Sequence, residues 1–142
     1  MKKIDGMTLV EILVVMGIIS FLAILGVVYF RSQIFKGNDA RRKSDLARIQ
    51  VAVEEYEKDN DCYPPEALVA CEPGGGLTPY TARIPCDPGG GSYFYEPEGA
   101  LCPSWYRIYA KLENESDEDI DADIGPGRVY NYYAGSPNAP DP

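Results

Sequence analysis

The sequence contains no histidine, so the residue that most often acts as a general base and as a metal ligand is absent. Its glycine triplets follow prolines and lack the lysine of a phosphate-binding loop, and no serine lies in a nucleophile elbow. We therefore expect no enzymatic activity and no catalytic residues. A clustered basic surface is also missing: 13 basic and 22 acidic residues give a net charge of −9, which argues against binding to nucleic acid.

Charge is missing altogether from a run of nineteen residues, Ile12 to Phe30. As a helix this run would cover about 28 Å, the hydrocarbon thickness of a bilayer. A short leader, residues 1–6, precedes it and carries Lys2 and Lys3, which would hold the N-terminus in the cytoplasm. A plain signal anchor fits these features. A secretory signal fits less well, because no clean Ala-x-Ala cleavage site follows the run.

Glu11, at the start of the apolar run, is the residue that a plain anchor leaves unexplained. A carboxylate in the apolar phase of a bilayer costs free energy and usually marks a pairing partner. Cleavage after Gly6 would give Met7 a free α-amino group, cationic near neutral pH. Glu11 would then lie about 6 Å along the helix from that amine. It could pair with its own N-terminus or with that of a neighbouring chain.

The segment Gly6-Met7-Thr8-Leu9-Val10-Glu11, between a basic leader and an apolar helix, resembles the prepilin signature of type IV pilins and type II secretion pseudopilins. The resemblance implies that a membrane prepilin peptidase cleaves between Gly6 and Met7 and methylates the new Met7 amine. It also implies that Glu11 pairs with Met7 of an adjacent subunit and sets the register of assembly. Two departures are Met7, where phenylalanine is commoner, and the lack of a proline within the apolar run.

By this resemblance the chain is a prokaryotic structural subunit. It would be held in the membrane by its single helix, assembled by pilus machinery in the inner membrane, and displayed as a homo-oligomeric extracellular filament. One alternative within the family is a pseudopilin that forms a periplasmic pseudopilus. Another alternative, from a different class, is a membrane-anchored protein that binds calcium or another ligand; it would keep Met1 and form no polymer.

We divide the chain into a leader (residues 1–6), a membrane or filament-core helix (7–30), an amphipathic continuation of that helix (31–60) and a globular region (61–142). In the continuation, Leu46, Ile49, Val53 and Tyr56 recur at helical spacing. Gly37-Asn38 is expected to bend or interrupt the helix. The charged residues are expected on its exposed face: Arg41, Arg42, Lys43, Asp45, Arg48, Glu54, Glu55 and Glu57. Asp59-Asn60-Asp61 and then Pro64-Pro65 mark its end.

Three short aromatic runs in the globular region are predicted to be strands: Ser92–Glu96, Trp105–Leu112 and Arg128–Tyr133. The second run alternates apolar and polar residues, which predicts a half-buried strand. No helical pattern separates the three, so we expect an antiparallel sheet packed on the extramembrane helix. The predicted fold class is therefore α+β, a long N-terminal helix packed against a small antiparallel sheet, and the resemblance implies a pilin fold.

Four cysteines lie in the globular region, at Cys62, Cys71, Cys86 and Cys102. None forms a Cys-x-x-Cys pair, and an even number outside the cytoplasm favours two disulfides. Three pairings are open. We favour Cys62–Cys71 with Cys86–Cys102, because each of these bonds would close one loop locally.

An acidic cluster contains Asp117, Asp119, Asp121 and Asp123, a spacing that mimics the first ligands of a calcium loop. The match then fails, because Ile124 stands where a glycine is needed and Tyr130 where the bidentate glutamate is needed. Calcium-bound loops occur in pseudopilin and some pilin heads, so by resemblance these four aspartates are a calcium candidate. A solvated acidic loop is the preferred interpretation, and no cofactor is otherwise expected.

Overall fold

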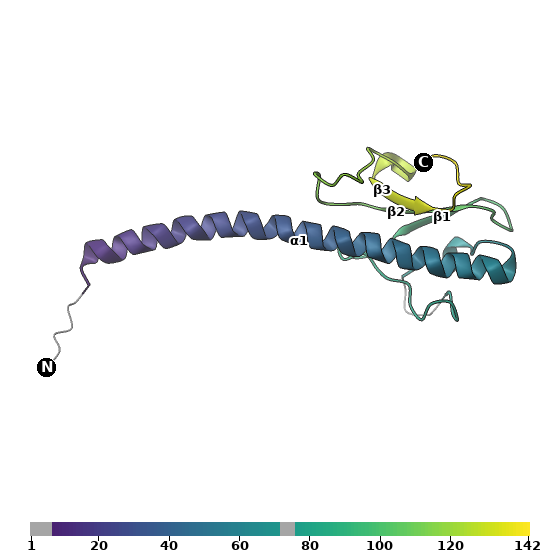
Figure 1. Cartoon of the computed structure of the whole chain (residues 1–142), viewed down its shortest axis with the longest axis horizontal. Coiled ribbons are helices and arrows are strands. Elements are labelled where there is room, and N and C mark those ends of the chain that lie inside the picture. The colour runs from purple at the N-terminus through teal and green to yellow at the C-terminus, as the bar shows by residue number, and fades with distance from the viewer. Residues whose placement is uncertain (1–6, 72–75) are drawn as a thin grey trace. The chain divides into compact units, whose positions relative to one another are not determined.

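The computed structural model describes residues 7–71 and 76–142 of the chain (Figure 1). Its elements are helix α1 (Leu9–Asn60), the 3-10 turn η1 (Glu66–Leu68), strand β1 (Phe94–Pro97), strand β2 (Tyr106–Ala110), the 3-10 turn η2 (Pro126–Arg128) and strand β3 (Tyr132–Gly135). The chain divides into two compact units, Met1–Ile34 and Phe35–Pro142. We call them the N-terminal unit and the head unit. Gly6 and the rest of the leader lie outside the described residues.

Helix α1 runs for 52 residues and enters both units. The expected interruption at Gly37-Asn38 is wrong, because helix continues through both residues. A glycine costs a helix about 1 kcal/mol, and the hydrogen bonds of the nearby Asp39 to the amides of Glu113 and Asn114 offset that cost. The helix ends where the sequence indicates. Asp61 adopts a left-handed backbone conformation, with φ of 57°, and Pro64-Pro65 cannot continue the helix.

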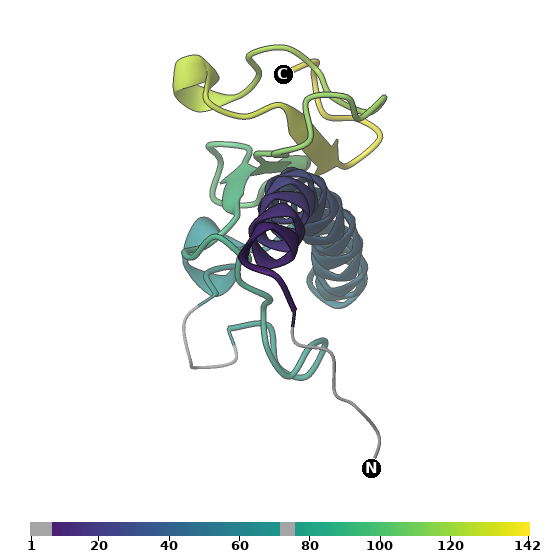
Figure 2. The same cartoon turned by 90° about the vertical axis from the view of Figure 1, so that its left-hand side faces the viewer.

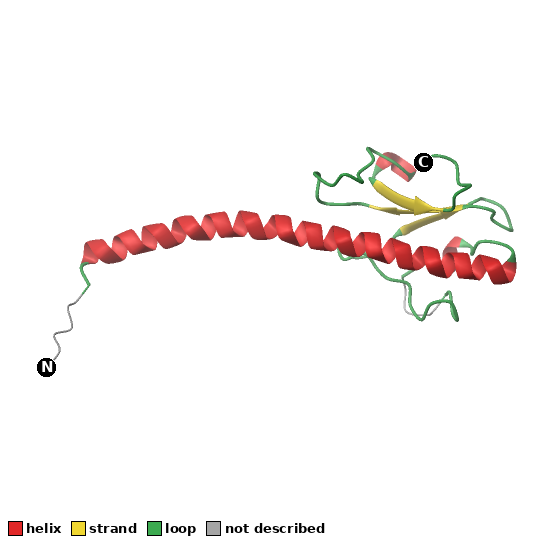
Figure 3. Ribbon diagram, in the orientation of Figure 1, coloured by secondary structure: helices red, strands yellow, loops and turns green. Residues whose placement is uncertain are grey.

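The three strands form one antiparallel sheet in the order β1-β2-β3. Ile108 in the central strand pairs with Tyr95 on one side and Ala134 on the other. The predicted α+β class, a long helix packed with a small antiparallel sheet, is confirmed (Figure 3). Within the head unit the sheet lies on one side of α1, and the segment 76–85 passes on the other side (Figure 1, Figure 2).

The core of the head unit lies between α1 and the inner face of the sheet. Leu46, Ile49 and Val53 of the helix are at most 1% exposed. They belong to one cluster with Tyr106 and Ile108 of β2, which are fully buried. Burying side chains of this size contributes about 1.5–3 kcal/mol each, so this contact holds the helix to the sheet.

Strand β2 corrects the expectation of a half-buried strand, because all five of its residues are buried. Because β2 is the central strand, β1 and β3 cover its two edges. The loop after residue 120 covers its outer face. There the backbone of Gly125 lies so close to the Tyr109 ring that a Cβ would fall 2.9 Å from it. Tyr130 adds a ring 5.5 Å from that of Tyr109. The alternation of apolar and polar residues along β2 therefore does not indicate a strand with one solvent-exposed face.

Strand β3 begins at Tyr132, four residues later than the predicted start at Arg128. Gly125, Gly127 and Arg128 all have positive φ, of 70°, 69° and 54°. Such backbone belongs to turns and not to strands. The run was predicted to be a strand from its aromatic residues, and these give no sign of the turn.

The disulfide pairing is also corrected: Cys62 pairs with Cys102, and Cys71 with Cys86. The Cα atoms are 5.1 Å apart in each pair. The first bond forms because the loop before β2 returns to the end of α1, where the Tyr63 amide donates to the Pro103 carbonyl (2.9 Å). Local loop closure was therefore the wrong criterion, since tertiary structure brings distant cysteines together.

Candidate functional site

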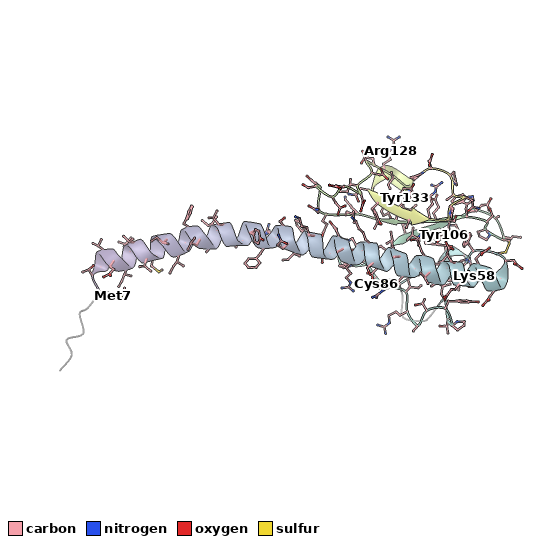
Figure 4. All side chains as sticks on the ribbon, in the orientation of Figure 1. Met7, Lys58, Cys86, Tyr106, Arg128 and Tyr133 are labelled. Atoms are coloured by element: carbon pink, nitrogen blue, oxygen red, sulfur yellow. A yellow bond between two sulfur atoms is a disulfide. The ribbon has the colours of Figure 1, made fainter. Side chains whose placement is uncertain are left out.

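The N-terminal unit exposes an apolar helix surface. From Leu9 to Phe30, every large apolar side chain that the structure describes is exposed, and Leu9 is 76% exposed. Figure 4 shows side chains leaving this part of the helix on several sides. An 18-residue window of α1 has a mean hydropathy of 2.8, with none of it buried. A core helix of the same composition would be covered by its own chain, whereas this surface is suited to contact with lipid or with another protein chain.

The Thr8 side chain caps the start of this helix. The Glu11 amide donates to Thr8 Oγ1 (3.3 Å), and the Ile12 amide donates to the Thr8 carbonyl (3.2 Å). Thr-x-x-Glu is the spacing of a capping box, in which the glutamate faces the start of the helix. An acid in the first turn also stabilises the positive end of the helix dipole. Glu11 thus occupies the glutamate position of that spacing, which the sequence reasoning missed.

Arg42 forms the centre of a buried ionic cluster in the head unit. Its Nη1 lies 2.8 Å from Asp39 Oδ1 and 3.1 Å from Glu113 Oε2, and its Nε lies 2.8 Å from Asp87 Oδ2. Arg42 is only 3% exposed. The expectation that Arg42 and Asp45 lie on the exposed helix face is therefore wrong. Asp39 and Arg42 continue the buried spacing of Leu46 toward the N-terminus, which is the signal that could have identified them.

The cluster joins three segments of the head unit. Asp39 accepts hydrogen bonds from the backbone amides of Glu113 (3.0 Å) and Asn114 (2.7 Å). Burial raises the pKa of the Asp87 carboxyl, but the hydrogen bonds from Arg42 and from the Gly89 amide outweigh burial and hold that pKa below its ordinary value. The pKa of the Arg42 guanidinium is raised, chiefly by its hydrogen bond to Asp87. Arg42 and Asp87 therefore stay charged at neutral pH.

The acidic cluster after β2 is held by Lys43. Its Nζ lies 2.6 Å from both Asp117 Oδ1 and Asp119 Oδ2, and 5.5 Å from the centre of the Tyr132 ring. The hydrogen bond from Lys43 lowers the pKa of Asp117. An ammonium group therefore occupies two of the four calcium candidates.

Asp121 and Asp123, the other two calcium candidates, are exposed. In residues 7–71 and 76–142 the structure brings together no three histidine, cysteine or acidic groups able to hold a metal ion. The calcium hypothesis thus gains no ligand set from the described part of the chain.

Residues 1–27 match the family model of the prokaryotic N-terminal methylation motif, which is the prepilin-type signature of type IV pilins and pseudopilins. No curated protein and no solved structure matches the chain. The motif supports a protein of the pilin-like or pseudopilin class, with processing by a prepilin peptidase. It includes Met7, Glu11 and most of the exposed apolar run.

Proposed function

We propose that this chain is a type IV pilin-like subunit that polymerises through its N-terminal helix into an extracellular helical filament. The single observation that carries the proposal is the exposed apolar surface from Leu9 to Phe30, located within and directly after a prepilin-type motif. A bilayer would cover this surface in the newly made subunit. Neighbouring helices would cover it in the filament.

Glu11 is proposed to set the register of assembly. Cleavage between Gly6 and Met7 leaves an α-amine, which the peptidase methylates and which remains cationic. In a filament core this amine would be dehydrated together with the Glu11 carboxylate of a neighbouring subunit. A pair of opposite charges that leaves water is strongly disfavoured when one partner is missing, so a subunit in the wrong register would leave both charges unpaired.

The contact repeated in such a filament joins two different surfaces of the subunit. A heterologous contact whose rotation does not close generates an open helix. The four cysteines of the head unit are paired, as suits a protein exposed to an oxidising exterior. The acidic surface of the head would face solvent, and repulsion between heads is screened by salt within about 10 Å at 0.1 M.

Mass spectrometry of the mature N-terminus tests the proposal, together with electron microscopy of material sheared from the cell surface. We expect a chain that begins at methylated Met7 and filaments that contain it. A mature chain that keeps Met1 and forms no polymer would overturn the proposal and favour a membrane-anchored binding protein. A processed chain without surface filaments would identify a periplasmic pseudopilus instead, since the motif is shared by both kinds of subunit.

A further inference from the structure

A groove lies beside α1 in the head unit, on the side away from the sheet. It has a volume of about 450 Å³, and its walls include Ser44, Ala47, Arg48 and Val51 of the helix and Tyr80 and Thr81 of the facing segment. Val51 is 59% exposed there. The groove is thus lined mainly by small, apolar and aromatic side chains, together with one arginine.

Between residues 36 and 48 of α1, the exposed charged side chains are all basic. Lys36, Arg41 and Arg48 are exposed, whereas the two acids of the same stretch, Asp39 and Asp45, are buried. Lys36 and Arg48 have no carboxylate within 4 Å among the described residues. The Arg41 side chain is 65% exposed, and its Nε lies 3.7 Å from Asp45. In a chain of net charge −9, this is a cationic surface that its own chain leaves largely unpaired.

The complementary surface is the acidic loop, residues 115–123 of the same head unit. Glu115, Glu118, Asp121 and Asp123 are exposed, and none has a cation within 4 Å in the described ranges. Lys43 holds the loop in place through Asp117 and Asp119, so these free carboxylates project from an ordered segment. The half-buried Ile120 and the exposed Ala122 interrupt the acids.

We propose that the groove receives the acidic loop of a second copy of this chain, with carboxylates of the loop against Arg41 and Arg48. The inference rests on the proposed function, because it assigns one head-to-head contact of the filament. The groove and the loop are different surfaces, so the contact is heterologous and propagates without closing. Placing opposite charges together favours the correct partner and register, whereas like charges in the same place cost several kcal/mol.

Charge reversal in the full-length chain tests this contact. The variants are R41E/R48E, E118K/D121K and the combination of all four. R83E/R128E and E66K/D141K serve as controls, since they change net charge equally at exposed positions elsewhere. The measurement is filament mass per subunit in the membrane, with free-thiol labelling to verify that both disulfides form. Each reversal of one surface should lower the yield about tenfold, since like charges then meet. The combination should restore most of it, and the controls should assemble as the unchanged chain does.

Coupling with a water-soluble carbodiimide gives a second measurement that does not depend on loss of assembly. In filaments of the R48K variant, the introduced amine should become joined to the peptide that carries Glu118 and Asp121 of another copy. Mixed isotope-labelled subunits distinguish a bond between copies from one within a copy. Absence of this product from R48K filaments, or reversals that assemble normally, would overturn the contact and leave the proposed function intact. An unchanged chain that keeps Met1 and never polymerises would overturn the proposed function itself.

Discussion

Arg42 and Asp87 form a two-point ion pair: Arg42 Nε donates to Asp87 Oδ2 at 2.8 Å, and Nη2 donates to Oδ1 at 3.1 Å. The pair joins α1 to the glycine-rich segment after Cys86, across 45 positions of sequence. Because Arg42 is buried, its removal leaves carboxylates without a cation in a poorly hydrated place.

Substitution of Arg42 by methionine should therefore destabilise the head unit by about 3–5 kcal/mol, the usual cost of breaking a buried pair from one side. Thermal unfolding of the full chain in detergent, followed through its tyrosine signal, measures this loss. R42K is the matched control. It keeps the charge but cannot make two parallel bonds to Asp87. The stability of R42K should therefore fall between that of the unchanged chain and that of R42M. An R42M chain as stable as the original would show that the pair contributes nothing.

The stability of the head unit should also decrease at acidic pH. The pKa values of Asp87 and Asp117 are lowered in the folded chain. A carboxyl whose folded pKa lies below its unfolded value of about 3.9 contributes stability above that pH, which is lost as the pH falls through the folded pKa. The melting temperature should therefore be insensitive to these groups from neutral pH to about 4 and decrease below it. In K43M the contribution of Asp117 to this decrease should shrink.

Two substitutions can separate a capping role of Glu11 from its proposed role in setting register between subunits. Glu11→Gln keeps the side-chain geometry of a capping box, whereas Glu11→Ala removes it. If the charge sets register between subunits, both variants should lose filaments by about tenfold or more, because an unpaired dehydrated amine remains. Cleavage after Gly6 and disulfide formation in the head should be unaffected. Normal filaments from Glu11→Gln, with loss only in Glu11→Ala, would assign Glu11 to capping alone.

The two disulfides should differ in their contribution to stability. Cys62–Cys102 spans 40 residues and Cys71–Cys86 spans 15. In the chain-entropy description, closing these loops stabilises by about 4 and about 3 kcal/mol. The double variant C62S/C102S should therefore unfold at lower denaturant than C71S/C86S. Equal midpoints would mean that strain or residual structure, and not loop length, decides the difference.

Because of Lys43, the stability of the acidic loop should not depend on calcium. Its ammonium group holds Asp117 and Asp119, so the melting temperature should be the same in chelator and in millimolar calcium. In K43M the two carboxylates lose their cation, and we expect a lower melting temperature that calcium partly restores, since calcium prefers carboxylate oxygens. Limited proteolysis of the loop gives a second readout. A calcium-dependent melting temperature in the unchanged chain would revive the metal hypothesis.

Elements governed by local rules were predictable from the sequence. The end of α1 follows from Asp61 and the two prolines, and β1 and β2 lie where aromatic runs were found. β3 was misplaced because a turn with positive φ at Arg128 is invisible in an aromatic run. The apolar run was identified because no ordinary core helix has its composition.

Features that depend on distant segments were not predictable. Arg42 was assigned to the exposed face because a charged residue on an amphipathic helix is usually solvated, and only three carboxylates from separate segments make its burial favourable. The disulfides were paired by proximity in sequence, but β2 brings Cys102 to the end of α1. In each case the deciding interaction joins residues far apart in the chain.

The bond between Cys62 and Cys102 has a mechanical consequence. In the proposed filament, tension would be transmitted along the helices, and Cys62 follows the end of α1 by two residues. The disulfide joins Cys62 to Cys102, which lies in the segment that precedes β2. Pulling force that reaches the end of the helix can therefore pass into the central strand without stretching residues 63–101, and that segment is shielded from the load.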